Sequence, residues 1–177
     1  MKIAFISLII CFFSSQDLIN YSNSDYHFEV KFPKDYKIEK DKLEEKFASI
    51  EYIRISGSEK CSNGLLSGNL IYRLICYKFE RKPIITINKL NFHDVIIAYS
   101  KRQNESSFVA DNLTIKSKTE NKDTLYYVLT DESKGLLEHR KIIIHDSLTY
   151  CLSIMSNKDF LKSEYIGEFF NSMKIKK

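Results

Sequence analysis

Four short runs of β-prone residues between positions 112 and 155 constrain the fold of this chain most strongly. They read NLTIKSK, TLYYVLT, LLEHRKIII and LTYCLSIM, and they are rich in β-branched and aromatic side chains. The segments that separate them, TENKD, DESKG and HDS, carry residues that favour turns. Strands joined by such short turns pair with their sequence neighbours in antiparallel order. The sequence therefore predicts a four-stranded antiparallel meander.

Three further runs upstream predict additional strands. Apolar and polar residues alternate from Tyr26 to Phe32, and Pro33 ends the pattern. FASIEYIRIS at residues 47–56 and LIYRLICYKF at residues 70–79 have the same β-branched and aromatic character. Together with the meander, these runs predict an antiparallel sheet of about six to seven strands.

Two polar segments lie around these strands. GSEKCSNGLLSGN, residues 57–69, is rich in Ser, Gly and Asn and predicts a loop, but its glycines lack the spacing of a phosphate-binding loop. KIEKDKLEEK, residues 37–46, interleaves charges of both signs, which is typical of a solvated face. Because the net charge is only +4, the sequence gives no indication of a nucleic-acid partner.

A helix is predicted in NKLNFHDVIIAYSKRQ, residues 88–103. Phe92, Ile96 and Tyr99 fall on one face at helical spacing, and Asn88 is a candidate N-cap. The β-branched residues of this segment would also suit a strand, so that alternative stays open.

A second helix is predicted within SNKDFLKSEYIGEFFNSMKIKK, residues 156–177. Ser156 and Asp159 have the spacing of a capping box. The apolar residues that follow form a stripe suited to docking on a sheet, and they are Leu161, Tyr165, Ile166, Phe169, Phe170 and Met173. The expected fold class is therefore α+β, an antiparallel sheet with helices packed on it.

The N-terminus has the layout of a secretory signal peptide. MKIAFISLIICFFSSQD places Lys2 before an uncharged apolar run that is too short to span roughly 30 Å of hydrocarbon as a helix. We expect a signal peptide at residues 1–15, a flexible tether at 16–25 and a single domain at 26–177, and hence an exported protein, periplasmic or secreted. The alternatives are a buried N-terminal element and a lipoprotein modified at Cys11, which is disfavoured because Ile10 is bulky.

Three cysteines remain after such a signal peptide. Cys61 and Cys76 are a candidate disulfide pair in an oxidising compartment. The alternative is that the cysteines are buried thiols, because Cys76 and Cys151 both lie within strand-like runs. The chain has no C-x-x-C spacing, so we expect neither a thioredoxin-like redox site nor a structural zinc cluster.

Both ends of the expected domain resemble proteins with the PsbP-like fold. The opening FEVKFPKDYKI, in which a strand ends at a proline followed by an aromatic residue, resembles the start of such domains. SLTYCLSIM and the helix ending in FFNSMKI resemble their end, although HDS stands where that group has a glycine turn. The resemblance covers the order of elements from Tyr26 to Ile175. It implies an α/β/α sandwich in a small exported protein, a bacterial member of unknown function that acts by binding partners.

His145, Asp146 and Ser147 are the residue types of a hydrolase triad, but we interpret them as a turn. Successive residues of a strand point to opposite faces, so three neighbours cannot converge as a catalytic relay. Asp and Ser between two apolar runs are also typical of a tight hairpin.

The histidines give no metal site either. His139 and His145 share a strand face but lie roughly 20 Å apart at about 3.3 Å per residue, and His27 and His93 are isolated. We expect no catalytic residues, no cofactor and no metal.

The expected function is that of a non-enzymatic envelope protein that presents a sheet edge or face to a protein partner. The alternative is a small-ligand or lipid carrier with a pocket between the sheet and a helix, at residues 92–99 or 161–170. An enzyme ranks third, and its polar cluster would be Glu138, His139 and Arg140, which alternate between strand faces.

Overall fold

A seven-stranded antiparallel sheet forms the centre of the protein. The computed structural model describes residues 18–45, 48–63, 66–81 and 92–176. The strand order is β3-β4-β5-β9-β8-β7-β6, with bounds β3 Lys37–Glu44, β4 Ala48–Asn63, β5 Leu66–Arg81, β6 Thr114–Asn121, β7 Thr124–Asp131, β8 Leu136–His145 and β9 Leu148–Asn157. Because β6 to β9 are neighbours in chain order, the predicted meander is confirmed.

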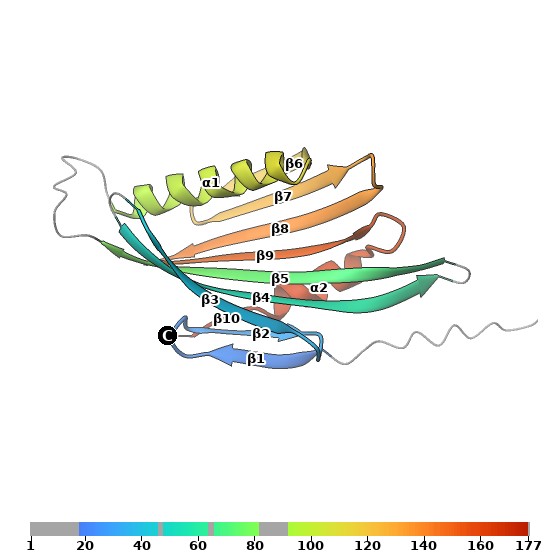
Figure 1. The fold of residues 1–177 in the computed structure, drawn as a ribbon, viewed down its shortest axis with the longest axis horizontal. Coiled ribbons are helices and arrows are strands. Elements are labelled where there is room, and N and C mark those ends of the chain that lie inside the picture. The colour runs from blue at the N-terminus through green and yellow to red at the C-terminus, as the bar shows by residue number, and fades with distance from the viewer. Residues whose placement is uncertain (1–17, 46–47, 64–65, 82–91, 177) are drawn as a thin grey trace, which may run out of the picture.

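Two further layers cover the faces of this sheet. Helix α1 (Phe92–Ala110) lies on one face, while helix α2 (Ser163–Ser172) and a small sheet lie on the other (Figure 1). The small sheet has the order β1-β2-β10, with β1 Ile19–Asn23, β2 Phe28–Phe32 and β10 Lys174–Ile175. The chain thus has an α+β fold that is dominated by antiparallel sheet.

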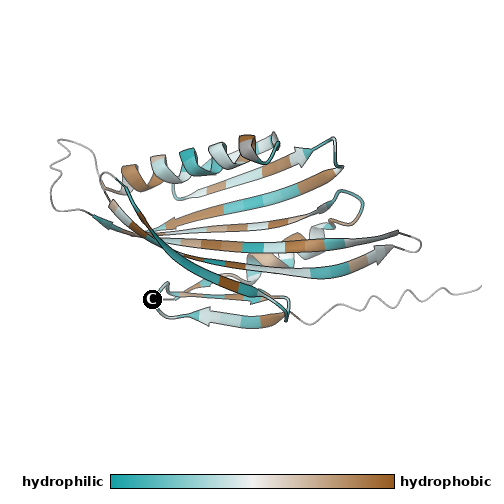
Figure 2. Cartoon of the chain, viewed as in Figure 1, coloured by the Kyte–Doolittle hydropathy of each residue, from teal (hydrophilic) through white to brown (hydrophobic). Residues whose placement is uncertain are grey.

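The core consists of two apolar clusters, one on each face of the large sheet. The cluster beneath α2 contains Phe28, Phe32, Tyr72, Tyr150 and Phe169, all buried, together with the predicted apolar stripe of α2. The cluster beneath α1 is smaller. Hydrophilic stretches interrupt the strands, as in the middle of β8, which has hydrophobic ends (Figure 2). The face beneath α1 therefore carries polar groups that need partners.

Residues 57–63 and 66–69 do not form the predicted loop, and residues 64–65 lie outside the described part of the chain. They extend β4 and β5 into one long hairpin, in which Cys61 lies opposite Gly68. The glycines serve packing: a Cβ at Gly57 would lie 3.2 Å from the Pro33 ring, and one at Gly68 would lie 2.8 Å from the Phe160 ring. Glycine in this segment thus allows close approach of a neighbouring ring, which local composition does not distinguish from turn formation.

The charged segment KIEKDKLEEK is solvated as predicted over residues 37–44, and it also forms a strand that the sequence did not indicate. Residues 37–44 of this solvated segment form β3, an edge strand whose residues are all exposed. The expected tether of residues 16–25 contains β1, which pairs with β2. In both segments, backbone pairing with an already ordered neighbour supplies a stability that the local sequence does not show.

The two predicted helices are present. The segment predicted at residues 88–103 is helical from Phe92 and continues to Ala110, while Asn88 lies outside the described residues. The capping box is wrong, because Ser156 belongs to β9 and its hydroxyl donates to the Asn69 carbonyl at 2.8 Å. Helix α2 begins at Ser163 instead.

Two glycine substitutions test the role of the hairpin glycines. Gly68→Ala should lower the free energy of unfolding by about 1 to 3 kcal/mol, because the new methyl group overlaps the Phe160 ring. Gly167→Ala is the matched control: its Cβ meets nothing within 4 Å, and alanine should stabilise α2 by up to about 1 kcal/mol. Urea unfolding measures both. Equal effects of the two changes would contradict the packing role of Gly68.

Candidate functional site

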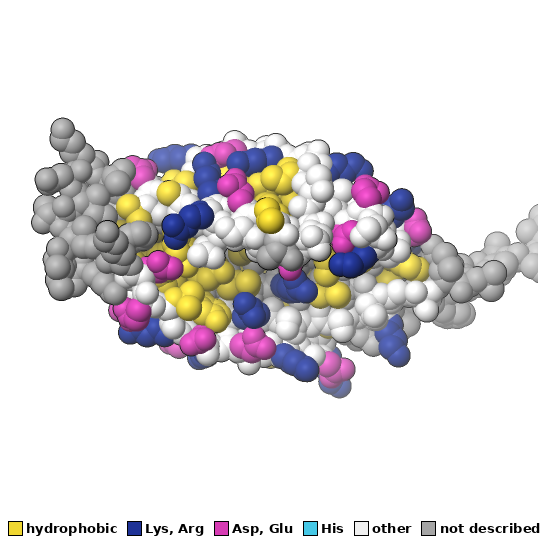
Figure 3. Space-filling model, turned by 45° about the horizontal axis from the view of Figure 1, so that its top comes forward, with side chains coloured by type: hydrophobic (Ala, Val, Ile, Leu, Met, Phe, Trp, Pro, Cys, Tyr) yellow, Lys and Arg dark blue, Asp and Glu magenta, His cyan; other side chains and the backbone are white. Residues whose placement is uncertain are grey.

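A cleft lies on the face of the large sheet that α1 covers. The first half of α1 packs on the sheet through Ile96 and Tyr99, whereas its second half also presents Gln103, Asn104 and Ser107. Between these polar residues and strands β4, β5, β8 and β9 lies a cavity of about 530 Å³. This volume is within the range of small-molecule sites. Figure 3 shows this face, where charged side chains of both signs surround exposed apolar ones.

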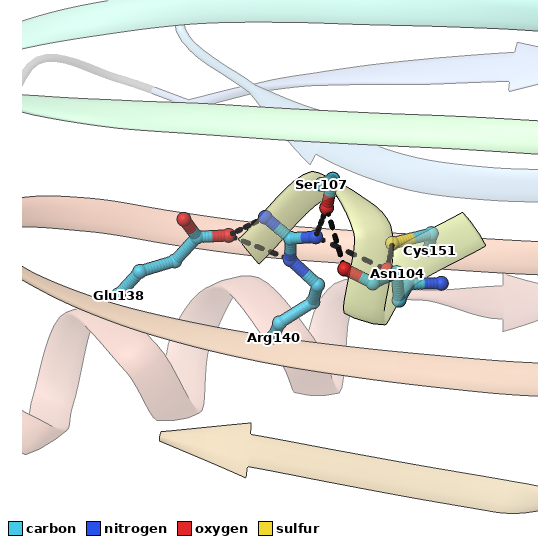
Figure 4. A network of polar contacts seen from close by, with 5 residues as sticks. All are labelled: Asn104, Ser107, Glu138, Arg140 and Cys151. Carbon is cyan, nitrogen blue, oxygen red and sulfur yellow. Dashed lines mark hydrogen bonds and ion pairs between the residues drawn. The ribbon is translucent and has the colours of Figure 1, made fainter. Parts of the chain in front are cut away.

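The buried guanidinium of Arg140 organises the floor of the cleft (Figure 4). Its Nε donates to Glu138 Oε1 at 2.7 Å, and its Nη2 lies 2.7 Å from the same oxygen. Its Nη1 donates to Asn104 Oδ1 at 3.1 Å and to Ser107 Oγ at 2.8 Å. The Cys151 thiol donates to Asn104 Oδ1 at 3.4 Å. One side chain of β8 therefore links a buried carboxylate to two residues of α1.

This network holds a charge pair away from solvent. Glu138 is 1% exposed and Arg140 is 7% exposed. Burial alone would lower the pKa of Arg140, but nearby negative groups, Glu138 among them, raise it, so the guanidinium stays charged. A buried pair of this kind is strongly destabilising when only one partner is removed.

Arg140 also supplies the positive charge that the end of α1 lacks. The last turn of α1 contains no basic residue. The Arg140 guanidinium lies 4.8 Å from the centre of the Phe108 ring and bonds Ser107, both in the final turns of α1. Because the C-terminal end of a helix is the negative end of its dipole, a cation at this place is favourable. The network thus stabilises the half of α1 that borders the cleft.

A row of hydrogen-bond donors crosses the sheet at the level of Arg140. In the strand register, Ser56 of β4 faces Arg73 of β5, Arg73 faces Ser153 of β9, and Ser153 faces Arg140 of β8. All four residues line the cleft. Arg140 bonds Glu138, Asn104 and Ser107. The side chains of Ser56, Arg73 and Ser153 make no hydrogen bond or ion pair with any other described residue.

Of the remaining charged residues of the cleft, Arg54 and Glu39 form a pair. Arg54 Nη1 lies 3.3 Å from Glu39 Oε2, and both side chains are exposed. Asp111 stands at the exposed end of α1. Cys151 is the buried thiol beside Arg140, and burial raises its pKa to about 11 although the Arg140 charge lowers it in part. The thiol is therefore protonated at neutral pH.

Asp146 and Ser147 form the predicted turn between β8 and β9, and His145 is the last residue of β8. Asp146 adopts a left-handed backbone conformation (φ 53°), and His145 and Asp146 are exposed. His145 Nε2 and Asp146 Oδ2 lie 3.8 Å apart. The three residues lie outside the cleft, and the hairpin interpretation agrees with their geometry.

The cluster of Glu138, His139 and Arg140 is divided between the two faces of the sheet. Glu138 and Arg140 join the network under α1, whereas His139 hydrogen-bonds the Tyr126 hydroxyl on the α2 side. His27 is exposed at a left-handed position (φ 51°), and the side chain of His93 lies outside the described part. Within the described ranges, no group of three or more His, Cys, Asp or Glu side chains is arranged to hold a metal ion.

The candidate disulfide partners lie far apart along the β4–β5 hairpin. Cys61 faces Gly68, while Cys76 faces Ile53, eight residues away on the strand of Cys61, or roughly 26 Å at 3.3 Å per residue. Both are free thiols in the structure. Cys11 belongs to residues that the structure does not describe. Among the helices that it does describe, none combines the length and the apolar character needed to cross a membrane.

Sequence reasoning missed several residues of the cleft. Asn104 and Ser107 continue the face of α1 that begins at Ile96, so a polar extension of the apolar stripe was the available signal. Arg73 and Ser153 had no such signal, because their proximity depends on the register between β5 and β9.

Comparison with known proteins adds no assignment to this geometry. No family model, no curated protein and no solved structure matches the chain. The resemblance to the PsbP-like fold therefore stays a prediction, and the function has to be argued from the cleft itself.

Removal of one partner of the buried pair of Glu138 and Arg140 should lower the free energy of unfolding. Arg140→Met leaves Glu138 buried without its counterion, and Glu138→Leu does the same to Arg140, so each should lower the free energy of unfolding by about 3 to 5 kcal/mol. The double variant should be more stable than either single variant, because it buries no unpaired charge. Urea unfolding of the full cycle checks this expectation.

The exposed pair of Lys31 and Glu168, 3.9 Å apart, is a suitable control for that cycle. Lys31→Met should change the free energy of unfolding by less than about 1 kcal/mol. Strictly additive losses from Glu138→Leu and Arg140→Met would show that the two side chains act independently.

The stability of the protein should fall with decreasing pH in a way that depends on His139. Burial lowers the pKa of His139 below 6.5, so the unfolded chain binds a proton more readily than the folded one. The contribution of His139 is fully present above pH 6.5 and is lost as the pH falls through its folded pKa. Unfolding free energies between pH 8 and pH 5 should decline less in His139→Gln than in wild type. Tyr126→Phe keeps the imidazole and should keep the wild-type slope, and an unchanged slope in His139→Gln would refute the assignment.

Proposed function

We propose that this protein is an exported, non-enzymatic binding module and that the cleft beneath α1 holds a small molecule. The observation that carries the proposal is a cavity of about 530 Å³ lined by donors that have no partner within the described protein. None of these donors belongs to the buried polar atoms that lack a partner, so they are open to the cleft and can bond a ligand or water that enters it. The Arg140 network holds one wall in place before any ligand arrives, which reduces the ordering cost of binding.

Several features favour binding over catalysis. No histidine lines the cleft within the described residues, and the Cys151 thiol is protonated and occupied with Asn104. A nucleophile needs a base within hydrogen-bond reach, and Cys151 has the buried charge pair of Arg140 and Glu138 beside it instead. These features support a site that retains a ligand unchanged.

The geometry favours a small ligand over a partner that pairs with the sheet edge. The two edge strands, β3 with KIEKDKLE and β6 with TIKSKTEN, are fully exposed and rich in charge, and β6 has an irregular register between Ile115 and Ser117. Charged side chains and bulges on an edge strand discourage the addition of another strand. The protein-partner hypothesis stays a prediction from the sequence, as does export.

A substitution that fills the cleft tests the proposal. Ser56→Phe places an aromatic ring into the cavity, whereas Ser58→Phe adds the same ring at an exposed position outside the cleft lining. Protein purified under native conditions should release a small molecule on denaturation, detected by mass spectrometry, in wild type and in Ser58→Phe. The molecule should be lost from Ser56→Phe. Equal recovery from Ser56→Phe and wild type, or no small molecule from any of the three proteins, would contradict the proposal.

A further inference from the structure

We infer that the ligand of this cleft is a small amphiphilic anion. Its carboxylate or phosphate group is held by Arg73 between the hydroxyls of Ser56 and Ser153, and its apolar body lies along Ile75 and Tyr77. This inference rests on the proposed function, since it names the chemistry of the molecule that occupies the same cleft.

The anion end follows from the row of donors across the sheet. Ser56, Arg73 and Ser153 are directly opposite one another on β4, β5 and β9, and neighbouring strands lie about 4.8 Å apart. Two hydroxyls therefore flank one guanidinium at a spacing that lets all three reach the oxygens of a single group. The planar fork of arginine matches the two oxygens of a carboxylate or phosphate.

Arg73 is the one cation of the described cleft lining that makes no ion pair, and Asp111, which lines the same cleft, lies beyond ion-pair distance of it. Arg54 is paired with Glu39 and Arg140 with Glu138, whereas Arg73 is half-buried and makes no ion pair with a described residue. Arg73 also borders a second hollow of about 170 Å³ in which Glu138, Asp131 and Asp111 take part, and none of their carboxylates lies within ion-pair distance of it. A cationic ligand would meet like charge here, and a neutral one would leave the guanidinium without a counterion.

The apolar end follows from the next residues of β5. Ile75 and Tyr77 lie two and four positions beyond Arg73, so they share its face, and both line the cleft in half-buried positions. Burial raises the pKa of Tyr77, so its ring remains neutral. From Arg73 to Tyr77 the strand spans about 13 Å, which accommodates a chain of several carbon atoms. A bare inorganic anion would leave this apolar part of the cleft unfilled.

Three ligands that differ in their head groups test the inference by isothermal titration calorimetry. The probes are octanoate, neutral octanamide and cationic octylammonium, each titrated into the purified full chain. Octanoate should bind at least about ten times more tightly than octanamide, because a hydrogen bond to a charged group contributes more than one to a neutral group. Octylammonium should not bind measurably.

Variants then assign the selectivity to Arg73. Arg73→Gln should weaken octanoate binding about 10- to 100-fold and leave octanamide unchanged, and Arg73→Lys should restore part of the affinity. Arg102→Gln, which removes an arginine from the exposed surface of α1, should bind octanoate as wild type does. Because Arg73 makes no hydrogen bond or ion pair with a described residue, unfolding curves should show that Arg73→Gln remains folded.

The outcomes separate this inference from the proposed function. Equal affinities for octanoate and octanamide, in wild type and Arg73→Gln alike, would overturn the inference that the ligand is an anion. The cleft would still be a binding site. Failure of octanoate to bind would also overturn the anion inference, and the proposed function would then stand only if a small molecule co-purifies with wild type and is lost in Ser56→Phe. If octanoate does not bind and no small molecule co-purifies with the wild type, both the anion inference and the proposed function are overturned.

Discussion

The antiparallel pairing of β5 with β9 is the interaction on which the rest of the structure depends. It joins the hairpin sheet of β3, β4 and β5 to the meander of β6 to β9, through residues 71–78 and 148–155. The same pairing places Leu74 beside Leu152 in the core under α2, and Arg73 beside Ser153 in the cleft under α1. One register therefore sets both the apolar core and the polar site, because side chains alternate between the two faces.

The two faces of the large sheet differ in the side chains that pack on them. The face under α2 and the small sheet is filled with aromatic side chains, such as Tyr72 and Phe169, whose ring centres lie 5.2 Å apart. The face under α1 combines a smaller apolar cluster with the buried pair of Glu138 and Arg140. The cleft lies between the polar residues of the second half of α1 and this part of the sheet.

Part of the candidate site could be predicted from the sequence. Glu138 and Arg140 are two positions apart in a recognisable strand, so their common face follows from the period of a strand. The donors at the other side of the cleft, Arg73 and Ser153, are separated by 79 intervening residues, and no local pattern relates them. The same limit applies to Gly57 and Gly68, which indicate a turn locally but allow ring packing in the folded chain.

The sequence by itself determined the α+β class, the meander of residues 112–155, the turn that follows His145 and the apolar stripe of the last helix. Each of these follows from local periodicity and turn chemistry, which act within a few residues. Only the tertiary structure decided the sheet order, the length of the β4–β5 hairpin, the strand character of residues 37–44 and the arrangement of the cleft. These depend on pairings between distant segments, whose stability comes from backbone hydrogen bonds and shared burial that no single segment encodes.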